Sequence, residues 1–114
     1  MRLYSVCIFA NADGVTFTEM TPDLRRCILA HRHGEVPFTA TRAIRRLLFL
    51  EFFPDRAEAS AKEKEIKCMT QSQIHALIEI DNPLWYDLAP GVGQKDTRLP
   101  DGRSVPGYPG ALEG

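Results

Sequence analysis

The stretch that decides the fold runs from residue 3 to residue 31 and reads LYSVCIFANADGVTFTEMTPDLRRCILAH. Its first seven residues are rich in β-formers, and residues 15–20 alternate apolar with polar side chains, so both segments predict strands. Residues 11–14, Asn-Ala-Asp-Gly, favour the turn between them. Thr21, Pro22 and Asp23 then have the composition of a helix start, with Thr21 as the predicted cap. We therefore expect a hairpin that leads directly into a helix.

The predicted helix has one apolar face. Leu24, Cys27, Ile28 and His31 recur at helical spacing, and Gly34 is a plausible end. Cys27 and His31 are four residues apart, so their side chains should lie one above the other on the buried side.

The remaining elements follow from apolar runs and caps. An apolar run from Leu47 to Phe53, just before a proline, predicts a third strand that begins near Arg46. Asp55 should cap a helix that ends near Lys67, and Thr70 should begin another that stops before residues 82–83, Asn-Pro. Trp85 and Leu88 are expected to close onto the core.

These elements define an α+β fold: a small three-stranded antiparallel sheet flanked by helices, in the order β-β-α-β-α-α. Residues 1–90 should form one domain, as expected for a chain of 114 residues. Nine of the 24 residues from 91 to 114 are glycine or proline, which predicts a flexible C-terminal tail.

Composition limits the functional classes. The sequence has no signal-peptide pattern and no apolar run long enough to span a bilayer, so no membrane association is expected. Three cysteines without a secretion signal favour a reducing, cytoplasmic setting over a disulfide framework.

The net charge of −1 conceals an uneven distribution. Residues 21–50 contain six arginines and only two acids, and guanidinium groups suit phosphate contacts. The segment could bind a nucleic acid backbone, or it could be an ordinary solvated surface. The candidate nucleic-acid-binding residues, with one lysine from a later helix, are Arg25, Arg26, Arg32, Arg42, Arg45 and Lys62.

Several short fragments occur in a characteristic order along the chain. They are residues 11–14 (NADG), 23–26 (DLRR), 45–47 (RRL), 62–67 (KEKEIK), 76–79 (ALIE) and 82–85 (NPLW), with His31 and Gly34. With this ordered set, the chain resembles the short stand-alone bacterial proteins of the GIY-YIG nuclease superfamily over residues 3–90. This resemblance implies a three-stranded antiparallel sheet with helices, and cleavage of DNA phosphodiesters with one divalent metal ion.

The resemblance also assigns site residues. Glu63 falls on the glutamate that holds the metal, for which Mg²⁺ is the expected cation, and Lys62 on the basic residue before it. His31 matches a His or Tyr of the first helix. Cys27 falls where the family has arginine, while Arg26 points about 100° away around the helix.

The two motif tyrosines are also replaced, by Cys7 and Phe17, and a glycine is replaced by Glu19. The tyrosines would orient or deprotonate the attacking water, and the arginine would stabilise charge on the phosphate. Losing one such group commonly costs roughly 100- to 1000-fold in rate. We therefore expect a DNA-binding, GIY-YIG endonuclease-like domain with weak or lost Mg²⁺-dependent hydrolysis. The alternative is a non-catalytic nucleic-acid-binding or protein-interaction module on the same fold.

Each candidate catalytic residue (Cys7, Phe17, Cys27, His31 and Glu63) has a simpler interpretation. Glu63 could be an exposed helix carboxylate, and His31 could favour the negative end of a helix. The two cysteines could be small buried hydrophobic residues. A zinc site built from Cys7, Cys27, His31 and Glu63 is chemically possible, although zinc is less expected here than magnesium.

Overall fold

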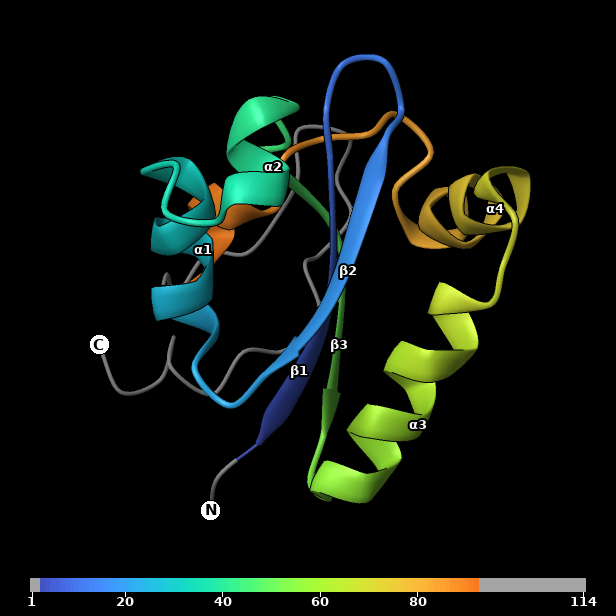
Figure 1. Ribbon diagram of the computed structural model, residues 1–114. Helices are drawn as coiled ribbons and strands as arrows, with labels where there is room; N and C mark the ends of the chain where they lie inside the picture. Colours follow the sequence, from blue (N-terminus) through green and yellow to red (C-terminus); the bar gives the residue numbers. More distant parts are fainter. Residues whose placement is uncertain (1–2, 93–114) are drawn as a thin grey trace.

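The computed structural model describes residues 3–92. Its centre is a three-stranded antiparallel sheet in the spatial order β2-β1-β3, with β1 at Tyr4–Ala10, β2 at Thr16–Thr21 and β3 at Arg46–Phe53. Helices α1 (Leu24–Arg32) and α2 (Pro37–Thr41) lie on one side of the sheet. Helices α3 (Arg56–Lys67) and α4 (Gln71–Asp81) lie on the other (Figure 1). A short 3₁₀ helix, η1, follows at Ala89–Gly91.

The predicted fold class and the order of the main elements are confirmed. Two elements are additional: α2 follows α1 where no helix was predicted, and η1 follows α4. The predicted tail begins at residue 91, and all but its first two residues lie outside the described residues. Among residues 3–92, no helix combines the length and the apolar character needed to cross a membrane.

The central strand β1 divides the core in two. Because successive side chains of a strand point to opposite faces, Cys7 and Phe9 pack against α1, while Val6 and Ile8 pack against α3 and α4. All four of these side chains are fully buried. The two halves of the core therefore pack against opposite faces of the sheet. As predicted, Leu88 is buried on the α1 side, and Trp85 packs partly buried on the other.

The first helix begins differently from the prediction. Asp23, and not Thr21, is its N-cap: the Asp23 carboxylate accepts a hydrogen bond from Arg26 N–H at 3.1 Å. Thr21 is the last residue of β2, and its hydroxyl accepts from Asp23 N–H at 3.0 Å. The strand extends through the position where a cap was expected because residue 21 still pairs with Ser5 of β1. The predicted end is supported by Gly34, whose φ of +71° suits a glycine.

The other predicted caps are confirmed. Asp55 accepts from Ala57 N–H at 2.9 Å, and Thr70 forms a reciprocal capping box with Gln73. These contacts fix where α3 and α4 begin. Helix α3 packs beside β2, one of the two edge strands of the sheet.

Candidate functional site

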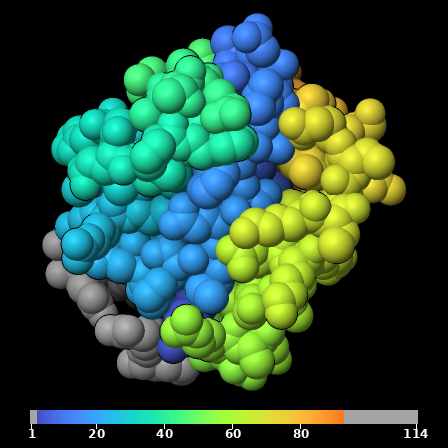
Figure 2. Space-filling view, in the orientation of Figure 1, coloured from blue at the N-terminus to red at the C-terminus, as the bar shows by residue number. Residues whose placement is uncertain are grey.

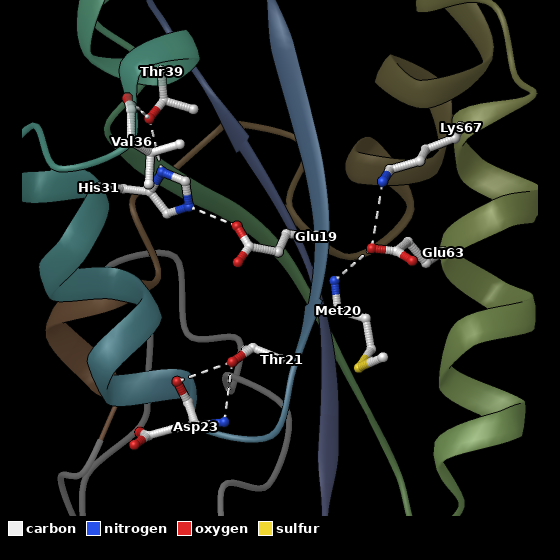
Figure 3. Close-up of polar contacts among 9 residues, drawn as sticks. All are labelled: Glu19, Met20, Thr21, Asp23, His31, Val36, Thr39, Glu63 and Lys67. Carbon is white, nitrogen blue, oxygen red and sulfur yellow. Dashed lines mark hydrogen bonds and ion pairs between the residues drawn. The ribbon is translucent and has the colours of Figure 1, made fainter.

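A buried histidine lies between α1 and the sheet. His31 is 1% exposed, and both of its ring nitrogens have partners. Its Nδ1 lies 2.8 Å from Thr39 Oγ1 of α2, and its Nε2 lies 3.0 Å from Glu19 Oε1 of β2. Figure 3 shows the imidazole held between these two side chains. Three separate elements therefore fix its orientation.

The Thr39 hydroxyl determines which nitrogen carries a proton. It donates its single hydrogen to the Val36 carbonyl at 3.2 Å, so it can only accept from His31 Nδ1–H. His31 Nε2 faces the Glu19 carboxylate oxygen at 3.0 Å, within hydrogen-bond distance. The hydrogen bond from His31 accordingly lowers the pKa of Glu19, more than partial burial raises it.

Two cysteines adjoin this pair. Cys27 lies one turn before His31 on α1 and hydrogen bonds to Glu19. The ligand atoms of Glu19, Cys27 and His31 all lie within 4.8 Å of one another. Cys7 is the β1 partner of Glu19 in the strand register and is fully buried. Burial raises the pKa of both thiols, and the nearby Glu19 carboxylate raises it further.

Aromatic side chains surround the imidazole. The rings of Phe9 and Phe17 have centroids 4.3 Å and 5.5 Å from that of His31. Phe38 of α2 lies 5.6 Å from Phe17 and carries the Arg42 guanidinium over its ring at 3.8 Å. Phe17 is therefore next to His31, as the resemblance implies, but it has no hydroxyl to offer.

Glu63 lies on the other side of β2. Its Oε2 accepts from Met20 N–H at 3.0 Å and is 3.4 Å from Lys67 Nζ one helical turn further along α3 (Figure 3). Met20 belongs to an edge strand, so this bond satisfies a main-chain donor that has no strand neighbour. The structure thus brings Cys7, Phe17, Cys27 and His31 together on the α1 side. Among the described residues, Glu19 and not Glu63 lies with Cys27 and His31 in a potential ligand group.

The edge strand also borders a pocket of about 260 Å³. In Figure 2 the strand is visible as a strip of surface between the α1–α2 side and α3. The pocket lies over the β2 residues nearest the hairpin, between α2 and the junction of α3 with α4. Its lining consists of Thr16, Phe17, Thr18, Phe38, Lys67, Met69, Gln71 and Ile74.

The predicted basic residues do not form one surface. Arg25 and Arg26 are exposed on α1, and Arg45 is exposed just before β3. Two others already have neighbours: Arg32 lies 3.8 Å from Asp87, and Arg42 stacks on Phe38. Lys62 belongs to α3, on the opposite side of the sheet, and lies 3.7 Å from Glu65.

Two residues of the site, Glu19 and Thr39, were not predicted as partners of His31. For Glu19 a signal exists, because residues 17, 19 and 21 of a strand share a face and Cys7 pairs opposite. For Thr39 the sequence offers none, since α2 has five residues and begins at Pro37. A helix of that length is too short to produce a periodic pattern.

Comparison with known proteins supports the fold. A solution NMR structure of a UPF0213 protein from Bacillus halodurans is similar to this chain, with a TM-score of 0.51 and 27% sequence identity. The match covers 75% of this chain and 92% of that one. UPF0213 proteins form a family of GIY-YIG-like fold, so this chain has a fold of that general type. No family model and no curated protein matches the chain.

Proposed function

We propose that this protein is a GIY-YIG endonuclease-like domain that binds DNA and has weak or lost Mg²⁺-dependent phosphodiester hydrolysis. The observation that carries the proposal is the contact of 3.0 Å between Glu19 and His31. Where the resembling proteins have a glycine, this chain has Glu19, and the Glu19 carboxylate contacts His31. A phosphate approaching that histidine would meet a negative charge, which disfavours productive binding.

Glu63 is the residue that would hold a magnesium ion. Its Oε2 is engaged by Met20 and Lys67, and Oε1 is the oxygen left for a cation. One carboxylate with several waters is an ordinary Mg²⁺ environment, so the residue fits the ion. When bound, the ion would polarise a phosphoryl oxygen and activate water.

The other residues supply little to such a reaction. Cys27 is a buried thiol where the resemblance implies an arginine, and burial keeps it neutral because it raises its pKa. Cys7 and Phe17 have no hydroxyl with which to orient water. These three replacements support weak or absent turnover, even where the metal residue remains.

DNA binding rests on different residues. Arg25 and Arg26 are adjacent and exposed on α1, and Arg45 is exposed before β3. Guanidinium groups at such positions can contact phosphates, and each contact makes binding weaker as salt increases. A protein-interaction module on the same fold is the alternative, and a binding measurement separates the two.

Cleavage is tested with supercoiled plasmid and Mg²⁺. We expect slow or undetectable nicking by the native protein, and no nicking by Glu63→Ala. Restoring Cys7→Tyr, Phe17→Tyr, Glu19→Gly and Cys27→Arg together should produce nicking that again depends on Glu63. Rapid nicking by the native protein that disappears in Glu63→Ala would overturn the claim of weak or lost hydrolysis.

Binding is tested by titrating a labelled duplex at several salt concentrations. Replacing both Arg25 and Arg26 by glutamine should reduce the slope of log K against log salt by about 1.8, or 0.9 for each lost phosphate contact. Arg56→Gln is the matched control, because Arg56 is an exposed arginine at the start of α3. If the native protein does not bind at low salt, the protein-interaction alternative takes the place of DNA binding.

A further inference from the structure

The α1 side of the sheet holds a set of side chains with the chemistry of a metal site. Glu19, Cys27 and His31 offer one oxygen, one sulfur and one nitrogen, all within 4.8 Å of one another. A tetrahedral zinc ion with ordinary bond lengths has its ligand atoms separated by roughly 3.3–3.8 Å. The three atoms therefore need only small side-chain movements to surround one ion.

His31 is already oriented as a ligand. Metal-binding histidines usually donate the other ring N–H to a fixed acceptor, which sets the tautomer and the ring plane. Here His31 Nδ1–H donates to Thr39 Oγ1 at 2.8 Å, and Thr39 in turn donates to Val36 O at 3.2 Å. The Nε2 lone pair is thereby aimed at the Glu19 carboxylate. A dication between them would replace the direct contact between the two groups.

Cys7 of β1 lies beside these three residues, although it is not in the group whose ligand atoms all lie within 4.8 Å of one another. It lies directly opposite Glu19 in the β1–β2 pairing, and directly opposite side chains on one face have Cβ atoms about 4.5–5.5 Å apart. Cys7 and Cys27 belong to the same buried cluster. Two thiolates and an imidazole form a donor set that zinc prefers over magnesium.

We propose that this chain binds one Zn²⁺ ion through Cys27, His31 and Glu19, with Cys7 as the fourth ligand. The site lies on the α1 side of β2, away from the Glu63 carboxylate to which the resemblance assigns magnesium. It extends beyond the proposed function and does not depend on DNA binding. Glu19, whose side chain is 33% exposed, is the point at which an ion can enter.

The ion would change the electrostatics of the site. A dication displaces the thiol protons on binding and lets the anionic donors share one positive centre. The gathering of two buried cysteines, a buried histidine and a partly exposed glutamate then has a single chemical reason.

The first experiment measures metal content in protein kept reduced and equilibrated with zinc, then desalted. We expect one zinc per native chain, and none in Cys27→Ser or His31→Gln. Cys68→Ser is the matched control, because Cys68 is an exposed cysteine at the end of α3 and should leave the stoichiometry at one. Folded native protein without zinc, or equal loss in Cys68→Ser, would overturn the proposal.

Cobalt substitution keeps the test decisive where a ligand variant fails to fold. Native protein loaded with Co²⁺ should show a near-ultraviolet thiolate-to-cobalt charge-transfer band and the visible spectrum of a tetrahedral ion. Cys7→Ser should reduce the charge-transfer intensity to about half, because one of two thiolates is lost. Unchanged intensity in folded Cys7→Ser would exclude Cys7 as a ligand, and an octahedral native spectrum would overturn the site.

Thr39→Val tests the orientation of His31 without removing a ligand. Loss of a partner that orients a metal-bound histidine typically weakens metal affinity 10- to 100-fold. We expect a decrease of that size in a zinc competition assay, with the stoichiometry still at one. An unchanged affinity would contradict the ligand role of His31 Nε2.

Discussion

The two sides of strand β2 use neighbouring residues in opposite ways. On the α1 side, the Glu19 side chain contacts His31 at 3.0 Å, and the contact depends on which side chains are present. On the α3 side, Glu63 contacts the Met20 main chain at 3.0 Å, and any residue except proline at position 20 would offer the same N–H. The first side is a polar cluster built of side chains, and the second is a carboxylate that covers a sheet edge.

This difference separates chemical specialisation from structural support. The α1 side combines a buried histidine, two buried thiols and a threonine that hydrogen bonds both to that histidine and to a main-chain carbonyl. Substitution of any of these residues would remove the contacts that its side chain makes. On the α3 side, Glu63 has a structural reason to remain even if no metal ever binds it. Retention of this glutamate is therefore weak support for catalysis, and the α1 side is the better place to look for function.

The largest effect on stability is expected from His31→Ala. The substitution removes a fully packed ring and leaves Thr39 and Glu19 without their common partner. Cavity formation and the loss of a largely buried polar contact should together cost about 3 kcal/mol of unfolding free energy. Urea denaturation in EDTA-containing buffer measures this cost without a contribution from bound metal.

His33→Ala is the matched control for that experiment. His33 lies two residues later, its side chain is 63% exposed, and its nearest acidic partner, Glu35, is 3.8 Å away. Its loss should change the free energy of unfolding by less than about 0.5 kcal/mol. If His31→Ala and His33→Ala lowered the free energy of unfolding equally, the contacts of the buried His31 side chain would not stabilise the α1 side.

A smaller effect is expected on the α3 side. Glu63→Ala removes the acceptor of Met20 N–H and should cost about 1.5 kcal/mol. Glu63→Gln keeps an acceptor oxygen and should cost only about 0.5 kcal/mol. Urea denaturation of both variants distinguishes the roles, with Glu65→Ala, an exposed position on the same helix, as control. If glutamine is as harmful as alanine, the charge of Glu63 and not the strand contact matters to stability.

Much of this fold could be predicted because its signals are local. The alternation of residues 15–20, the Asp55 and Thr70 caps and the apolar face of Cys27 and His31 each depend on near neighbours in the sequence. The start of α1 was misplaced because Thr21 and Asp23 are both good caps, and strand pairing with Ser5 decided between them. That pairing is a long-range property.

The candidate site was predictable only in part, for the same reason. Cys7, Phe17, Cys27 and His31 converge as expected, because strand and helix periodicity place them on one face. Glu63 could not be separated from them by sequence, since the side of β2 that α3 covers depends on the chain path after β3. Thr39 was missed because the five-residue helix that carries it has no periodic pattern.

The smallest effect is expected from Lys67 of α3, whose charge acts on an acidic residue on each side of β2. Its Nζ is 3.4 Å from Glu63 Oε2, and its charge also helps to lower the pKa of Glu19. The Lys67 side chain is 54% exposed, so each interaction is screened by water. A double-mutant cycle of Lys67→Ala with Glu63→Gln should give a coupling energy of about 0.3 kcal/mol, and the cycle with Glu19→Gln a smaller one. Both couplings should fall when the urea titrations are repeated at high salt. A coupling to Glu19 larger than that to Glu63 would show that Lys67 belongs electrostatically to the α1 side, and would remove the separation of the two sides of β2.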